Sequence, residues 1–280
     1  MKRVISPNGV VYYRSEIIPC IHGFSTRIGG VSQLAHTKGL NLGLDCGDSR
    51  ETVLENLELF SDALGIDSRS IISVSQIHSS KIRTVNSENR GEGFFKEELC
   101  PCDGYITDGY DITLGVRTAD CVPVLLYASE NNRFSGAVAA VHAGWRGTAL
   151  GIVKEAVDQL CLMGARVADI KAAIGPSIGS CCYCVKADFY ESFLRSAGKA
   201  LTSAFVNPVG EGKWVADLKG ANRQILHDSG IPYENIDVCD ECTCCNSEDF
   251  FSHRFSKGKR GTMLSVITKS RSKGDINERK

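Results

Sequence analysis

The chain has 280 residues, of which 42% are hydrophobic, and its formal net charge is −1. This is enough material for a large core, as one domain or two closely joined halves. The charge balance argues against a nucleic-acid or membrane-surface binder. No export signal follows Met1, and no apolar run approaches the length of a membrane span. We therefore expect a soluble, cytoplasmic protein.

Hydrophobic residues repeat at helical and at strand spacings along the chain. In chain order they predict a helix over 53–64, strands over 71–74, 112–116, 122–127 and 137–141, and helices over 152–160, 187–197 and 218–229. We expect one α/β or α+β domain over residues 1–268, with mixed β-sheets layered against helices. The polar segment 269–280 is predicted to be a flexible tail.

Thirteen cysteines are many for this length, and their number is odd. Without an export signal, we interpret them as reduced thiols rather than as a disulfide framework. They cluster at 100–102, 181–184 and 239–245, and the last cluster contains a Cys-x-x-Cys spacing that can chelate zinc. Because no matching ligand pair with the usual spacing is evident, the sequence favours plain thiols over a second metal site.

Three motifs far apart in the chain contain residues of types that bind zinc: His78, Cys121 and His142. Two imidazoles and one thiolate leave the fourth tetrahedral position open, which is the arrangement of a catalytic zinc site. All three are expected at strand ends, where backbone pairing fixes their geometry. Their separations match no local zinc-finger spacing, and a single histidine or cysteine is more often a packing residue. The residue types alone leave the metal site open.

Two glycine-bounded segments each carry an arginine. Arg146 lies in the segment 144–148, before a helix predicted to begin near Ala149, and Arg27 precedes Gly29 and Gly30. A glycine-rich loop at a helix N-terminus exposes backbone N–H groups to an anion, and a guanidinium adds donors for phosphate or carboxylate. A tight turn with Trp145 in the core is the alternative. The Gly-Lys-Ser/Thr of a P-loop is absent.

Seven motifs in fixed order resemble those of one known family, the YfiH/laccase-domain family, whose members were once labelled multicopper polyphenol oxidases. The resemblance extends from about His22 to Met263. The motifs are His22-Gly-Phe-Ser-Thr-Arg27-x-Gly29-Gly30-Val-Ser32, Leu40-Asn41-Leu42-Gly43, Gln76-x-His78, Thr118-Ala-Asp120-Cys121-x-Pro123, His142-Ala-Gly-Trp-Arg146-Gly147, Ile174-Gly175-Pro176-x-Ile178-Gly179-x-Cys181-Cys182-Tyr183, and Cys242-Thr243 with Phe250-Phe251-Ser252-x-Arg254.

The resemblance implies a YfiH-like α/β sandwich with one zinc ion bound by His78, Cys121 and His142. It also implies phosphate-dependent cleavage of adenosine, inosine, guanosine and S-methyl-5′-thioadenosine, together with deamination of adenosine. Copper follows only from the older family label.

These activities assign expected roles to further residues. For phosphorolysis, we expect Arg27 and Arg146 to hold the phosphate that attacks the C1′ carbon of the sugar, with Gln76 as a further substrate contact. For deamination, we expect zinc to lower the pKa of a water that attacks C6 of the purine. Asp120 is expected to orient a ligand or relay a proton.

Two departures from the family pattern stand out. Cys184 occupies a position that is usually acidic, and Arg260-Gly261-Thr262 reverses the usual Thr-Gly-Arg, which leaves the role of Arg260 open.

Three other functions use the same residues. One is a hydrolase with Cys121 as nucleophile and His142 or His78 as base. Another is a polyphenol oxidase, for which six histidines are few. The third is a binding or peptidoglycan-editing protein with a structural zinc. The preferred nucleoside, the balance of phosphorolysis to deamination, and the oligomeric state stay open.

Overall fold

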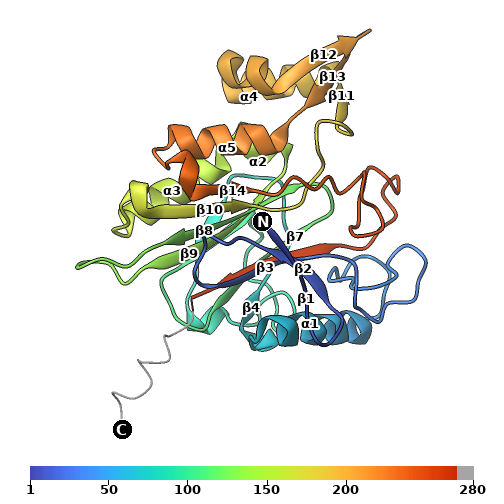
Figure 1. The fold of residues 1–280 in the computed structure, drawn as a ribbon, viewed down its shortest axis with the longest axis vertical. Helices are drawn as coiled ribbons and strands as arrows, with labels where there is room; N and C mark the ends of the chain where they lie inside the picture. The colour runs from blue at the N-terminus through green and yellow to red at the C-terminus, as the bar shows by residue number, and fades with distance from the viewer. Residues whose placement is uncertain (270–280) are drawn as a thin grey trace.

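Two six-stranded sheets face each other across the interior of the protein (Figure 1). The computed structural model describes residues 1–269. Both sheets combine parallel and antiparallel pairs. The first has the order β1 (Lys2–Ile5), β2 (Val11–Arg14), β3 (Ile21–Ser25), β15 (Met263–Thr268), β7 (Thr113–Thr118), β4 (Ile71–Ile72). The second has the order β14 (Ile236–Val238), β10 (Ile170–Ile174), β8 (Val122–Ala128), β9 (Ala137–Ala143), β6 (Gly104–Thr107), β5 (Ile82–Thr84).

The two sheets enclose a core formed by alternate residues of their strands. Leu114 and Val116 of β7 pack there against Val138 and Ala140 of β9. Ala137, Ala139, Val141 and Ala143 of β9 face outward against the helices, yet every residue of this strand is buried. A strand that is buried on both faces needs small or apolar side chains throughout, which explains its sequence Ala-Val-Ala-Ala-Val-His-Ala. The single polar member, His142, is on the inner face.

Helices cover both outer faces, which gives four layers. Helix α1 (Arg50–Leu64) packs Val53, Leu57 and Phe60 on the first sheet. It begins at the Ser49 cap and ends at Gly65, whose φ of 70° suits glycine. On the second sheet lie α3 (Ile152–Leu162) and α5 (Leu218–Asp228), preceded by the short α2 (Trp145–Ala149).

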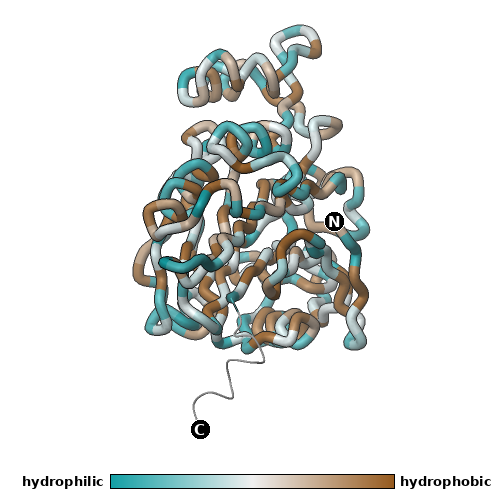
Figure 2. The backbone as a smooth tube through the Cα atoms, turned by 60° about the vertical axis from the view of Figure 1, so that its left-hand side comes forward, coloured by the Kyte–Doolittle hydropathy of each residue, from teal (hydrophilic) through white to brown (hydrophobic). Residues whose placement is uncertain are grey.

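A smaller unit projects from this sandwich at the top of Figure 1. It combines α4 (Ala187–Phe205) with a three-stranded sheet of β11 (Cys184–Lys186), β13 (Lys213–Ala216) and β12 (Val206–Gly210). Figure 2 shows the same projection, with hydrophobic and hydrophilic residues alternating along it. Phe189 and Phe193 anchor the first half of α4, whereas Gly198 has a φ of 81° and kinks the helix.

The predicted α/β sandwich of mixed sheets and helices is confirmed. Three of the predicted elements were wrong in extent. The strand over 71–74 ends at Ile72, because the next backbone N–H groups bond to Glu92 and to the Tyr105 hydroxyl instead of to a neighbouring strand. The helix over 187–197 continues through its kink to Phe205. The helix predicted to begin near Ala149 begins at Ile152 and is preceded by the separate short helix α2, so Arg146 is helical rather than in a loop.

The end of the described chain is held to the second sheet. Lys269 is buried, and its ammonium donates hydrogen bonds to the carbonyl oxygens of Asp108, Ser135 and Gly136. The rest of the predicted tail, 270–280, lies outside the described residues. Among the described helices, none has the length and apolar character to cross a membrane.

Candidate active site

Three antiparallel neighbours, β8, β9 and β6, bring distant residues to one end of the second sheet. Cys121 immediately precedes β8, and His142 is the penultimate residue of β9. Asp103 immediately precedes β6, and its carbonyl accepts a hydrogen bond from the His142 backbone N–H at 2.7 Å. His78 reaches the same place from the loop after β4. Strand pairing therefore fixes Cys121 and His142 relative to each other, as expected for residues at strand ends.

The three candidate ligands lie together. The sulfur of Cys121 and the ring nitrogens of His78 and His142 are all within 4.8 Å of one another. Cys121 Sγ is 3.9 Å from His78 Nε2, and the two imidazole rings meet edge to face with their centroids 4.9 Å apart. His142 is buried, whereas His78 is exposed, so the group is reached from one side. This donor set suits zinc, since it offers one sulfur and two nitrogens and leaves a side open.

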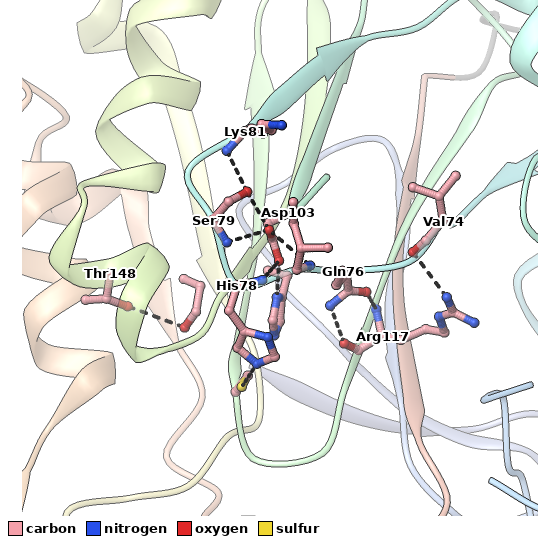
Figure 3. Close-up of polar contacts among 12 residues, drawn as sticks. Val74, Gln76, His78, Ser79, Lys81, Asp103, Arg117 and Thr148 are labelled. Atoms are coloured by element: carbon pink, nitrogen blue, oxygen red, sulfur yellow. Dashed lines mark hydrogen bonds and ion pairs between the residues drawn. The ribbon is translucent and has the colours of Figure 1, made fainter. Parts of the chain in front are cut away.

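Asp103 organises both histidines, and sequence reasoning missed it. Its fully buried carboxylate accepts a hydrogen bond from His142 Nδ1 at 2.8 Å. It also accepts from the backbone N–H groups of Ile77, His78 and Ser79 and from the Ser79 hydroxyl (Figure 3). These bonds hold His78 at a φ of 57°, which is unusual for a residue with a side chain. With Nδ1 bonded to Asp103, His142 presents Nε2 to the site, as metal-binding histidines do.

The charges of Cys121, His142 and Asp103 are mutually dependent. Burial raises the pKa of the Cys121 thiol, but the two imidazoles lower it to about 6. Burial lowers the pKa of His142, but Cys121 and Asp103 raise it to about 9. Burial raises the pKa of Asp103, but hydrogen bonds from His142 and Ser79 lower it to about 2. Without metal, Cys121 is therefore a thiolate at neutral pH, which is the form that binds metals.

Gly144 leaves room for this group of ligands. A β-carbon at residue 144 would lie 2.9 Å from His78 Cδ2, 3.3 Å from Cys121 Sγ and 3.5 Å from His142 Cε1. The chain passes this close to all three side chains only because residue 144 has none. This close approach explains why the His-Ala-Gly-Trp motif has glycine at residue 144.

Both oxygens of the Asp120 carboxylate are hydrogen-bonded to the segment 243–254. Its carboxylate accepts hydrogen bonds from the Thr243 hydroxyl at 2.6 Å and the Arg254 backbone N–H at 2.7 Å. Its φ of 95° is strained for a residue other than glycine, and these bonds stabilise it. Asp120 therefore links two parts of the chain: the turn that contains Cys121 and the segment 243–254.

Gln76 is paired with the backbone of Arg117. Its amide donates to the Arg117 carbonyl at 2.8 Å and accepts from the Arg117 N–H at 2.7 Å (Figure 3). Arg117 in turn donates to the Val74 carbonyl. Gln76 therefore fixes the loop that leads to His78, while both residues line the cleft described next.

A cleft of about 570 Å³ opens onto the three candidate ligands. This volume is within the range of small-molecule sites, about 300–1,000 Å³. Several of its lining side chains are basic, and they come from distant parts of the chain: His36, Arg117, His253, Lys259 and Arg260. Apart from Arg260, they were not among the residues that sequence reasoning considered. They lie in loops whose spacing carries no regular signal.

The two arginines expected to hold phosphate do not line this cleft. Arg27 stacks over the Phe251 ring and donates to the carbonyls of Ser247 and Lys38. Arg146 is exposed and stacks over Trp145. Arg260 does line the cleft; it donates to the Thr262 hydroxyl, and its buried Nε has no partner among the described residues.

Comparisons with known proteins extend the resemblance over almost the whole chain. Residues 21–270 match the family model described as "Multi-copper polyphenol oxidoreductase laccase". The chain is 35% identical to "Purine nucleoside phosphorylase YlmD" of Bacillus subtilis, covering 88% of this chain and 87% of that protein. It is also 35% identical to "Adenosine deaminase RL5" from an unknown prokaryotic organism, covering 84% and 88%.

Solved structures give the same result. The "hypothetical protein YfiH" of Bacillus licheniformis superposes with a TM-score of 0.86 at 36% identity, covering 95% of this chain and 97% of that one. YlmD of Geobacillus stearothermophilus superposes with a TM-score of 0.83 at 32% identity, covering 94% and 96%.

Proposed function

The chain belongs to the multi-copper polyphenol oxidoreductase laccase family, and we propose that within it this protein is a zinc-dependent purine nucleoside phosphorylase that also deaminates adenosine. The observation that carries the proposal is a three-donor group with an open side, at the end of a cleft with basic walls. Relatives over most of the chain bear the names of both activities. The substrates proposed are adenosine, inosine, guanosine or S-methyl-5′-thioadenosine, with phosphate.

His78, Cys121 and His142 would hold the metal, and zinc fits them better than copper does. A zinc ion with these ligands keeps one position for water or substrate and acts there as a Lewis acid. Multicopper chemistry needs several histidine-rich sites. Within residues 1–269, these two imidazoles belong to the only candidate metal-binding group that contains histidine.

Other side chains would position the ligands and bind the phosphate. Asp103 keeps His142 in one tautomer and holds the loop of His78. Arg117, Lys259 and Arg260 line the cleft with positive charge, which suits a phosphate dianion. The buried Nε of Arg260 would gain in a bound anion the partner that buried donors normally have. We therefore assign phosphate binding to this wall of the cleft in place of Arg27 and Arg146.

We also propose that residues 1–268 form one catalytic domain. The cleft combines His36 near one end of this range with Thr262 near the other, so neither half contains the site alone. All thirteen cysteines are free, which supports a reducing compartment such as the cytoplasm.

The test is a product assay on protein of measured zinc content, given adenosine with and without phosphate. Adenine and ribose 1-phosphate should form only when phosphate is present, and inosine should form in both conditions. His78→Ala should remove the zinc of this three-ligand site and abolish both activities together. Full activity in His78→Ala protein that has lost this zinc would contradict the proposal.

A cysteine hydrolase is the second candidate, favoured by one observation. Asp103, His142 and Cys121 form a chain of carboxylate, imidazole and thiolate, which is the order of a nucleophilic triad. Iodoacetamide separates the two functions. A bound zinc should protect Cys121 from alkylation, whereas rapid alkylation of Cys121 in protein that keeps its zinc would favour the hydrolase.

A further inference from the structure

Four cysteines from two distant turns of the chain lie together. Cys181 and Cys182 precede β11, and Cys242 and Cys245 lie in the turn that follows β14. Their four sulfur atoms are all within 4.8 Å of one another. Cys245 Sγ is 3.6 Å from Cys181 Sγ and 3.4 Å from Cys182 Sγ. The sequence alone showed no second ligand pair for Cys242 and Cys245. In the structure, Cys181 and Cys182 form this pair.

These distances fit a shared metal ion better than they fit disulfides. Four sulfurs placed about 2.3 Å from a tetrahedral zinc are separated by roughly 3.8 Å along each edge. A disulfide requires about 2.05 Å between its sulfurs. We propose that Cys181, Cys182, Cys242 and Cys245 bind a second, structural zinc ion.

The backbone around Cys242 is built to support a thiolate. The Gly179 N–H donates to Cys242 Sγ at 3.2 Å. A β-carbon at Gly179 would lie 3.1 Å from Cys181 Sγ and 3.4 Å from Cys242 Cβ. Glycine at 179 therefore lets the two turns approach closely.

The proposed site is closed and connects two segments that support the active site. Four thiolate ligands leave no position for substrate, which is the pattern of structural zinc. The ion would fasten the turn 179–182 to the turn 242–245. Thr243 lies in the second turn and donates to Asp120, the neighbour of Cys121. Cys242 is buried, but Cys181 and Cys245 are exposed, so an ion can enter from the surface.

The experiment counts metal in the full chain after zinc loading under reducing conditions. Wild-type protein should bind two zinc ions per chain. Cys245→Ser should bind one, His78→Ala should bind one, and the double variant should bind none. The matched control is Cys184→Ser, an exposed cysteine of the same segment outside the group, which should keep two. One zinc per wild-type chain, unchanged by Cys245→Ser, would overturn the proposal.

A second measurement covers the case in which Cys245→Ser does not fold. Cobalt bound to His78→Ala protein should give the intense thiolate-to-metal charge-transfer bands of a four-sulfur site, because only this group remains. Absence of bound metal in folded His78→Ala protein would count against the site. So would a disulfide between any two of the four cysteines in reduced, zinc-loaded protein. The proposal is independent of the nucleoside chemistry, since metal content alone decides it.

Discussion

The α-carbon of Gly144 lies so close to the His78 ring that a β-carbon would stand 2.9 Å from its Cδ2 atom. Because Cys121 Sγ and His142 Cε1 lie 3.3 and 3.5 Å from the same point, the methyl group of alanine would crowd all three candidate ligands. Gly144→Ala should therefore weaken zinc binding, by roughly 10- to 100-fold, as for other changes next to metal ligands. Competition with a chromophoric chelator measures the effect. Unchanged zinc affinity in the folded variant would show that the ligands tolerate displacement.

Replacement of the Asp103 carboxylate should weaken zinc binding, although Asp103 is not itself a candidate ligand. In Asp103→Asn the side-chain size is kept, but the charge and one acceptor oxygen are lost, so both His142 and the loop of His78 lose support. Zinc affinity should fall by roughly 10- to 100-fold. Ser79→Ala removes only one donor to the same carboxylate and should have a smaller effect. Equal losses in both variants would argue against the orienting role of Asp103.

Replacement of Arg260 should affect phosphate more than nucleoside. Losing a charged hydrogen bond costs about 1.5–3 kcal/mol, so Arg260→Ala should raise the KM for phosphate by roughly 10- to 100-fold. Deamination, which needs no phosphate, should change little. Arg146→Ala is the comparison, since Arg146 is exposed and stacks on Trp145 outside the cleft. A larger rise in the phosphate KM for Arg146→Ala would support the original sequence-based assignment.

Alkaline pH should destabilise the protein through the buried thiol of Cys239. Burial raises its pKa in the folded state from 9.0 to about 11, so the unfolded chain loses this proton first as the pH rises. The protonated Cys239 thiol thus contributes its full stabilisation of the folded state below pH 9. This stabilisation is lost as the pH rises toward 11. Denaturant unfolding of wild type and Cys239→Ala across this range measures it. The free energy of unfolding should fall less steeply with pH in the variant, whereas parallel curves would contradict the assignment.

Hydrophobic spacing was sufficient to predict the layers but not the site. The buried face of α1 has a helical period and β9 is a short apolar run, and both elements lie close to where the sequence predicts them. Asp103 gave no such signal, because its importance arises from the register of β6 against β9, which brings it to His142. Arg27 and Arg146 lie in glycine-bounded motifs that predicted phosphate binding. In the structure they stack on Phe251 and Trp145, outside the cleft. Local motifs report the conformation of a loop, and only tertiary packing decides which way its side chains face.

The position of β15 in the first sheet has a consequence for how the protein is made. This strand lies between β3 and β7, yet it is the last described strand to leave the ribosome. Until then β3 and β7 have no partner between them, and Thr262, which completes the cleft, has not been synthesised. Such distant pairings close slowly. A chain that stops before residue 262 therefore lacks both β15, which joins β3 to β7, and Thr262 of the cleft, so it can complete neither the first sheet nor the active site.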